Sequence, residues 1–314
     1  MWRLIQRLHD IGVVGINGRN AHYVLPHNRR RYYPLVDDKL LTKSLAQSAG
    51  VSVPPLYDVI EAEHEIRAVH DRLAAYNDFV IKPASGSGGD GIVVITGRAG
   101  NNYRKASGAI VRREEISYHI ANTLNGMYSL GGHRDKVIIE YRVRPDPVFG
   151  AISYEGVPDI RIVVFLGVPA MAMVRLPTRI SDGKANLHQG AIGAGIDLAC
   201  GRTLTAVWFN QVVTEHPDTT APVSGVDIPH WQRMLLLAAQ ARDICHLGYF
   251  GIDFVLDEEH GPMVLELNAR PGLNIQIANR AGLQPRLKRI ESATEDLATP
   301  EARVAFAQKW FGVD

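Results

Sequence analysis

The stretch Phe250-Gly-Ile-Asp-Phe-Val-Leu-Asp-Glu-Glu-His-Gly-Pro-Met-Val-Leu-Glu-Leu-Asn268 predicts a β-hairpin with acidic side chains on one face. Two apolar runs flank the turn-rich segment 257–261, which is typical of two antiparallel strands. A symmetric turn places Asp253 opposite Glu266. Because side chains alternate between the two faces of a strand, Glu266 and Asn268 share the face of Asp253. The other face is expected to carry Ile252, Phe254, Leu265 and Leu267.

This acidic face has two interpretations. Like charges directly opposite each other destabilise a sheet, so a hard cation between Asp253 and Glu266 would explain the arrangement. Mg²⁺ prefers a few carboxylates together with phosphate oxygens of a substrate. The alternative is a polar face in contact with water. The hairpin by itself leaves both interpretations open.

Composition excludes several classes of protein. The chain has 314 residues, 46% of them hydrophobic, and its 34 Lys and Arg nearly balance its 33 Asp and Glu. No overall field attracts nucleic acid, and the basic triplet Arg29-Arg30-Arg31 is expected to be a solvated surface loop. The sequence shows neither a signal peptide nor an apolar run of about 18 residues, which predicts a cytoplasmic protein that does not insert into a membrane. Cys200 and Cys245 are expected to be reduced and structural.

The order of expected elements indicates an α+β protein of two lobes. Residues 1–38 form a leader, 39–290 the main domain, and 291–314 a helical tail. Within the main domain, about 51–140 form a small lobe and 141–290 a large lobe, and Pro145 and Pro147 suggest a hinge between them. Helices are expected at 40–49, 61–75, 113–124, 229–246 and 300–310. Strands are expected at 79–83, 92–96, 136–144, 159–166 and 170–176, and a loop at 181–195.

A glycine-rich loop, Gly86-Ser-Gly-Gly-Asp-Gly91, follows the first of these strands. A dinucleotide-binding loop must open a helix, whereas Ile92-Val-Val-Ile-Thr96 predicts a strand. A protein-kinase loop is excluded because Lys82 precedes the glycines and no Asp-Phe-Gly occurs. Backbone N–H groups of the loop can close over a polyphosphate beside Lys82, and the alternative is an ordinary hairpin turn.

Several motifs in chain order resemble those of the ATP-grasp superfamily, and most closely those of RimK-like α-L-glutamate ligases and the α-L-glutamate ligase-related group. They are Asp38-Lys39, Val80-Ile-Lys82-Pro, the loop Ser85 to Gly91, Ile139-Glu-Tyr-Arg142, Asp159-Ile-Arg161, Asn186-Leu-His-Gln-Gly190, Gly251-Ile-Asp253 and Glu266-Leu-Asn268-Ala-Arg-Pro-Gly272. The resemblance covers about residues 38–275. It implies an α+β, two-lobed ATP-grasp fold with ATP bound between two antiparallel-sheet lobes.

The resemblance also implies roles for individual residues. Lys39 and Lys82 are expected to contact ATP, and Arg161 and Arg270 to clamp the phosphoryl group or a substrate carboxylate. Asn186 is expected to contact phosphate or substrate, while the role of His188 stays open because Gln189 stands where related ligases have Arg. The loop residues implied over the phosphates are Gly86, Ser87, Gly88, Gly89 and Gly91. The residues implied at adenine are Glu140, Tyr141 and Arg142, and those implied as ligands of Mg²⁺, or of Mn²⁺, are Asp253, Glu266 and Asn268.

The implied activity is ATP-dependent ligation of a carboxylate to an amine through an acylphosphate, on an amino acid, peptide or other small molecule. An ATP-grasp kinase that phosphorylates a hydroxyl, and a catalytically weak ATP-binding partner protein, are the alternatives. RimK-like ligases carry a separate α/β domain before the ATP-grasp core, and a leader of 38 residues is too short for one. Recognition of the acceptor is therefore expected to differ, with the leader, the 181–195 loop or a second protein chain completing that site.

Overall fold

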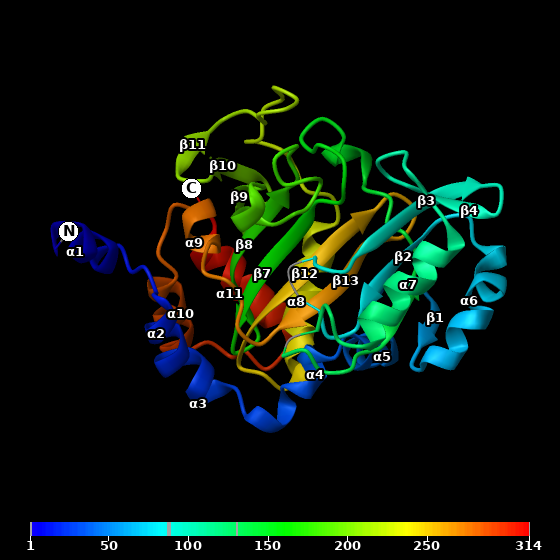
Figure 1. The fold of residues 1–314 in the computed structure, drawn as a ribbon. Helices are drawn as coiled ribbons and strands as arrows, with labels where there is room; N and C mark the ends of the chain where they lie inside the picture. Colours follow the sequence, from blue (N-terminus) through cyan, green and yellow to red (C-terminus); the bar gives the residue numbers. More distant parts are fainter. Residues whose placement is uncertain (1, 87–88, 130, 314) are drawn as a thin grey trace. The chain divides into compact units, whose positions relative to one another are not determined.

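The computed structural model describes residues 2–86, 89–129 and 131–313, so the loop residues Ser87 and Gly88 lie outside the described part of the chain (Figure 1). The chain divides into two compact units. Unit 1 comprises residues 1–37, 42–52 and 144–314, and unit 2 comprises residues 38–41 and 53–143. Each unit contains one antiparallel sheet, and each is described below by itself.

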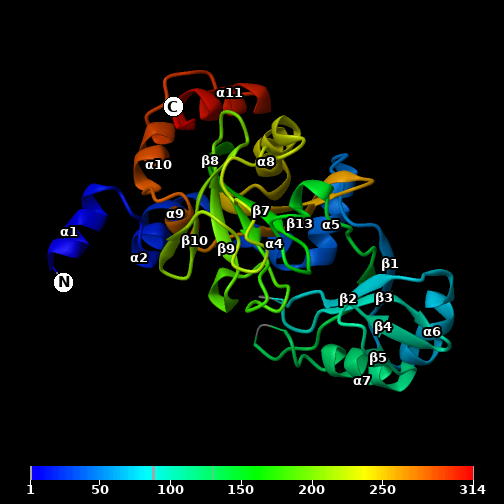
Figure 2. The ribbon, with the colours of Figure 1, turned by 90° about the horizontal axis from the view of Figure 1, so that it is seen from above.

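Unit 2 is built on a six-stranded sheet in the order β1-β6-β2-β3-β4-β5. Two helices, α6 (Ile66–Arg72) and α7 (Arg113–Leu124), pack against it (Figure 2). The core between them holds Leu73, Phe79, Ile116 and Ile139, each at most 1% exposed. The strands are β1 (Leu56–Ile60), β2 (Phe79–Pro83), β3 (Val93–Ala99), β4 (Asn102–Lys105), β5 (Ile110–Val111) and β6 (Val137–Glu140).

Unit 1 is built on a seven-stranded sheet in the order β11-β10-β9-β8-β7-β12-β13. Buried runs such as Ile162 to Phe165 explain why the central strands form, since β-branched and aromatic side chains fit a pleated, packed surface. The strands are β7 (Asp159–Phe165), β8 (Val168–Leu176), β9 (Ile192–Ile196), β10 (Thr203–Trp208), β11 (Gln211–Val213), β12 (Tyr249–Asp257) and β13 (Gly261–Asn268).

Helices cover this second sheet. Helices α8 (Trp231–Cys245) and α11 (Pro300–Phe311) pack against each other and on β8, and both views show them side by side (Figures 1 and 2). Helix α9 (Ile275–Ala278) contacts β8, β9 and β10, and α10 (Gln284–Glu291) contacts β8. None of the helices in the described part of the chain combines the length and the apolar character of a membrane-spanning segment.

The leader is tied to the end of strand β13. It contains α1 (Trp2–Asp10), α2 (Ile16–Arg19), α3 (Leu25–His27) and α4 (Pro34–Asp37), and α5 (Lys39–Ser48) follows. Asn28 Nδ2 donates to the carbonyl oxygens of Tyr249 at 2.6 Å and of Ala269 at 3.2 Å, and Asn28 Oδ1 accepts from Tyr249 N at 2.9 Å. Arg19 Nη1 donates to Pro271 O at 2.8 Å. The leader therefore braces the segment that directly follows Asn268.

Most expected elements are present, with three corrections. The strand expected at 136–144 ends at Glu140 in β6. The loop expected at 181–195 is shorter, because Ile192 already begins β9 and a short 3₁₀ turn forms at Leu187–Gln189. The third correction concerns Leu265, which was expected on the apolar face opposite Asp253. It is instead the extra residue of a bulge in β13.

Candidate active site

The bulge at Leu265 sets the register of the acidic hairpin. Near the turn, Asp257 pairs with Gly261 and Phe254 pairs with Val264, a register that would put Leu265 opposite Asp253. A register shift between Asp253 and Phe254 inserts one residue, so that Asp253 faces Glu266 as expected from the sequence. Bulges commonly occur beside functional sites because they re-aim the side chains that follow.

Four charged side chains form a network on this face of the unit 1 sheet. Arg161 of β7 lies directly beside Asp253 of β12 and binds both its carboxylate oxygens, Nε to Oδ1 at 2.7 Å and Nη2 to Oδ2. Arg175 of β8 lies opposite Asp159 of β7 and binds its carboxylate in the same two-pronged way. Arg175 Nη2 also reaches Asp253 Oδ2 at 2.8 Å, which joins the two pairs into one network.

Burial and pairing act in opposite directions on these carboxylates. Burial raises the pKa of Asp159 to about 6, although Arg175 opposes the shift. Burial would also raise the pKa of Asp253, but Arg161 and Arg175 together outweigh it and hold that pKa at about 2. Burial lowers the pKa of Arg161, but the negative charge of Asp253 raises it, and the pKa of Arg161 is raised overall. Asp253 is therefore an ionised carboxylate between two guanidinium groups.

The network changes the physical basis of the metal-site prediction. Arg161 and Arg175 supply the positive charge that Asp253 needs, so repulsion between Asp253 and Glu266 is no longer a reason to expect a metal. Glu266 is half-buried and accepts a hydrogen bond from Asn268 Nδ2 at 3.1 Å. Within the described residues no group of three or more His, Cys, Asp or Glu side chains is arranged to hold a metal ion. The carboxylate of Glu266 and the amide oxygen of Asn268 still suit Mg²⁺, and Asp253 could join them through Oδ1, which accepts only one of these arginine bonds.

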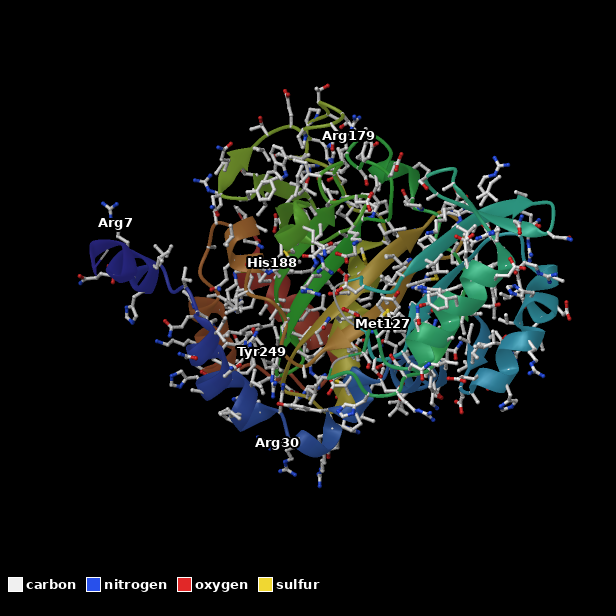
Figure 3. All side chains as sticks on the ribbon, in the orientation of Figure 1. Arg7, Arg30, Met127, Arg179, His188 and Tyr249 are labelled. Carbon is white, nitrogen blue, oxygen red and sulfur yellow. The ribbon has the colours of Figure 1, made fainter. Side chains whose placement is uncertain are left out.

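The segment that contains Asn186 lies over the same face of the sheet. A Cβ atom on Gly193 of β9 would lie 2.8 Å from Leu187, and Gly193 pairs with Arg175 across the sheet, so both point to this face. Asn186 Oδ1 accepts from His188 N at 3.0 Å and starts the 3₁₀ turn. His188 is exposed, and its Nε2 lies 3.4 Å from Asn274 Nδ2 (Figure 3).

The contacts of Arg270 differ from those of the four network residues. Its guanidinium is exposed and packs over the ring of Tyr33 in the leader, 5.4 Å from the ring centre. Its carbonyl oxygen accepts a long hydrogen bond of 3.4 Å from Arg19. The clamp role of Arg270 stays a prediction.

In unit 2, Lys39 and Lys82 both engage groups beside the glycine loop. Lys39 Nζ donates to the carbonyl oxygen of Gly86 and, at 3.4 Å, to that of Ala84. Lys82 on β2 forms an ion pair with Glu140 on β6, and both side chains are buried. The backbone N–H of Tyr141 donates to Pro55 O at 2.8 Å, and Arg142 Nε donates to Asp78 at 3.0 Å. The contact of residues 140–142 with adenine stays a prediction.

The two ends of the glycine loop are fixed. Ser85 N donates to both carboxylate oxygens of Asp135, at 3.1 and 3.0 Å, and Gly86 forms a β-bridge with Ser129. At the other end, His119 Nε2 lies 3.0 Å from Gly91 O. Gly91 has φ +75°, and a Cβ atom there would lie 2.6 Å from the ring of Tyr128. Position 91 therefore requires glycine, because any other side chain would clash with the ring of Tyr128 and would strain the backbone.

Substitution of Gly91 by Ala is expected to lower affinity for a nonhydrolysable ATP analogue about tenfold, measured by calorimetry, because the methyl group displaces the loop end from Tyr128. Gly100→Ala is the matched control. Gly100 also has a positive φ, +59°, but no atom lies within 4 Å of its added methyl group. The control carries only the backbone strain of about 1–2 kcal/mol. Equal affinities for the two variants would contradict a role of Gly91 in shaping the loop.

Sequence reasoning missed three residues of these two arrangements: Asp159, Arg175 and Asp135. Asp159 was part of a quoted motif without a role of its own, and Arg175 is the last residue but one of an otherwise apolar strand, Val-Pro-Ala-Met-Ala-Met-Val-Arg-Leu176. A lone Arg in a buried strand is a signal that a buried carboxylate lies nearby. Asp135 belongs to His133-Arg134-Asp135, which imitates a kinase motif, and its carboxylate instead holds Ser85 at the loop entrance.

No curated protein matches this chain. Several solved structures resemble it in fold. The ATP-grasp ligase PsnB, in complex with a minimal precursor, is 15% identical with a TM-score of 0.43 over 90% of this chain and 63% of PsnB. D-cycloserine synthetase DcsG is 21% identical with a TM-score of 0.41, over 88% of this chain and 70% of DcsG. The D-alanine-D-alanine ligase from Coxiella burnetii is 13% identical with a TM-score of 0.45, over 88% of this chain and 60% of the ligase.

The chain thus spans less than two thirds of the length of PsnB and of the D-alanine-D-alanine ligase. The family model of sugar-transfer associated ATP-grasp proteins matches residues 18–292. Together with the two antiparallel sheets, this match confirms the ATP-grasp fold class and superfamily. It does not show membership of the RimK-like group. The chain belongs to the sugar-transfer associated ATP-grasp family.

Proposed function

We propose that this protein is an ATP-dependent carboxylate–amine ligase whose chemistry is that of the RimK-like ligases. A substrate carboxylate attacks the γ-phosphate of ATP, which forms an acylphosphate and releases ADP. An amine then attacks the acyl carbon, the bond from carbon to the phosphate oxygen breaks, phosphate leaves, and the nitrogen loses a proton. The amide so formed joins an amino acid, a peptide or another small molecule.

The observation that carries this proposal is the charged face of the unit 1 sheet. Arg161 is held by Asp253 through Nε and Nη2, which leaves Nη1 on the side of Gly272, where a Cβ atom would lie 3.8 Å from it. A guanidinium fixed in this way can meet the negative charge of a transferring phosphoryl group without reorganising. The two hydrogen bonds from Arg161 to the buried carboxylate of Asp253 thus support the proposal that Arg161 binds the transferring phosphoryl group.

Glu266 and Asn268, with Asp253, are the residues that would hold Mg²⁺ or Mn²⁺. When bound there, the ion would neutralise charge that develops on the phosphoryl oxygens. Lys39, Lys82 and the glycine loop of unit 2 would contact the phosphates of ATP, and residues 140–142 would contact adenine. Lys39 supports this role because its ammonium already binds the backbone at Gly86, where the loop begins.

The acceptor is proposed to be an amine that is recognised near Asn186. Gln189 Oε1 is buried and accepts no hydrogen bond from the residues that the structure describes. A buried acceptor without a donor costs free energy, and a substrate N–H would satisfy it. We also propose that a second protein chain completes the acceptor site. The proposed location of the protein is the cytoplasm.

The test uses purified protein with ATP, Mg²⁺ and a panel of amino acids and short peptides, with hydroxylamine as a trap. An acylphosphate reacts with hydroxylamine to give a hydroxamate, so ATP-dependent hydroxamate formation with at least one carboxylate is the expected result. A phosphorylated hydroxyl in place of a hydroxamate would identify the kinase alternative. Neither product across the panel, despite tight ATP binding, would favour a catalytically weak ATP-binding partner.

Lys82→Ala is expected to weaken binding of a nonhydrolysable ATP analogue at least about tenfold, because a point charge beside the phosphates is lost. The same variant also removes the buried partner of Glu140, so lower stability is expected as well. The double variant Lys82→Met with Glu140→Gln separates the two effects, since it removes both charges while keeping similar volumes. It should recover the thermal midpoint but not the affinity. Wild-type affinity in the double variant would remove Lys82 from the nucleotide site.

A further inference from the structure

A basic pocket of about 610 Å³ lies in unit 1, away from the charged face. It includes Leu166, which directly follows β7, whereas Arg161 is the third residue of that strand. Five residues of extended chain separate the two positions by roughly 16 Å. The pocket therefore belongs to the other end of the sheet, and nothing in the proposed ligase chemistry uses it.

Three arginines line this pocket: Arg29, Arg242 and Arg303. One carboxylate, Asp243, is also in the lining, and its Oδ2 lies 3.3 Å from Arg303 Nη1. The lining thus carries three formal positive charges and one negative charge when its histidines are neutral. The excess of two positive charges in a concave site of this size favours an anionic ligand.

The three arginines differ in how far other groups already satisfy them. Arg303 is buried and donates to the carbonyl oxygens of Leu297, Ala239 and Ala298 in addition to Asp243, so it is part of the wall. Arg242 donates from Nη1 to Leu166 O at 2.9 Å, its one side-chain hydrogen bond to the described residues. Burial lowers the pKa of Arg242, and the neighbouring Arg303 lowers it further. A negative ligand would relieve this repulsion between the two guanidinium groups.

Arg29 is the most accessible of the three. Its residue is exposed, and no carboxylate among the described residues forms an ion pair with it. Arg31, two residues further on, is different, because its Nη2 donates to Tyr32 Oη at 2.6 Å and its guanidinium packs over that ring. Of the basic triplet Arg29-Arg30-Arg31, which was expected to be a solvated surface loop, Arg29 thus lines the pocket.

Aromatic and imidazole rings complete the lining. The rings of Tyr32 and His246 lie 5.1 Å apart and both line the pocket, as does His27, whose Nε2 is 3.9 Å from Glu291 Oε1. His246 ends helix α8 with φ +56°, a conformation that favours glycine. Flat rings of this kind suit the carbon body of an organic ligand, whereas the arginines suit its charged group.

We propose that this pocket binds a small organic phosphate. A phosphate monoester carries a charge of about −1.5 to −2 at pH 7, which matches the excess of two positive charges better than a single carboxylate does. Arg29 and Arg242 bind the phosphate oxygens, and Tyr32 and His246 contact the carbon body. This site is independent of the proposed ligase activity.

The test is calorimetric titration of the full chain with glycerol 3-phosphate, glucose 6-phosphate and inorganic phosphate, with glycerol as the neutral control. Each titration is done with the nucleotide site saturated by a nonhydrolysable ATP analogue and Mg²⁺ or, should the protein bind no nucleotide, without it. Saturable binding of at least one organic phosphate, tighter than that of inorganic phosphate, is expected. No saturable binding of any of the three would overturn the proposal, and equal or tighter binding of inorganic phosphate would overturn its organic part.

Two variants and one control locate the binding. Arg29→Ala is expected to weaken it at least about tenfold, and so is Arg242→Gln, which keeps an N–H donor for Leu166. Arg30→Ala is the control, since Arg30 is the next residue, carries the same charge and is not one of the residues that line the pocket. Wild-type affinity in Arg29→Ala, or an equal loss in Arg30→Ala, would contradict binding in this pocket.

Discussion

Glu266→Gln is expected to lower ATP turnover at least about 100-fold while the thermal unfolding midpoint stays near that of the wild type. Glu266 is half-buried and accepts a hydrogen bond from Asn268, which the side-chain oxygen of glutamine can also accept. The Asp253 that it faces already has Arg161 and Arg175 as partners, so loss of the charge at Glu266 is expected to change the stability little. Loss of a metal ligand removes several kcal/mol of charge stabilisation during phosphoryl transfer, and each 1.36 kcal/mol is tenfold in rate.

The control for this variant is Glu258→Gln. Glu258 lies in the turn of the same hairpin, is exposed, and stands 4.0 Å from Arg144. It receives the same substitution at a position without a proposed catalytic role, so turnover should be unchanged. Titration of Mg²⁺ into each variant with a nonhydrolysable ATP analogue gives a readout apart from turnover. Normal turnover and normal Mg²⁺ dependence in Glu266→Gln would contradict the metal assignment.

Arg175→Ala is expected to lower the free energy of unfolding by about 3–5 kcal/mol, since it strips a buried partner from two carboxylates. Asp159 loses its bidentate partner, and Asp253, 2% exposed, keeps Arg161 alone. Urea unfolding followed by circular dichroism measures the change. The same variant is expected to lose turnover as well, because it removes one of the two guanidinium groups that hold Asp253.

Arg202→Ala is the matched control for Arg175→Ala. Arg202 binds Asp227 through two hydrogen bonds, as Arg175 binds Asp159, but both partners of that pair are exposed to water. Exposed ion pairs contribute little, so no measurable loss of stability is expected. A loss in Arg175→Ala as small as in Arg202→Ala would show that the buried network does not stabilise the fold.

Local patterns in the sequence were enough to predict the acidic hairpin and the glycine loop between strands. Alternation along 261–268 places Glu266 and Asn268 on one face, because the period of a strand is fixed by its backbone, but only the bulge brings Glu266 opposite Asp253. The bulge at Leu265 was beyond this reasoning, since apolar residues occupy the neighbouring positions in either register. Packing against neighbouring strands decides where such an extra residue goes.

The arginine network was missed for a different reason. Arg175 meets Asp159 and Asp253 only through the register of β8 on β7 and of β7 on β12, and register between strands is set by tertiary packing. Likewise, nothing local links Asp135 to Ser85, which lie 50 residues apart in the chain. Strand β9 was missed because glycine is depleted in strands, yet Gly193 and Gly195 lie in it, where α9 and Leu187 pack too closely for a side chain.

Transfer of an oxygen atom from the substrate carboxylate to the released phosphate tests the proposed ligase chemistry most directly. A carboxylate that passes through an acylphosphate gives one of its oxygens to phosphate when the amine displaces it. With a substrate labelled with ¹⁸O in the carboxyl group, the account predicts one ¹⁸O atom in the phosphate released per turnover, detected by mass spectrometry. Unlabelled phosphate released together with an amide would contradict it, and so would a phosphorylated hydroxyl formed without release of phosphate.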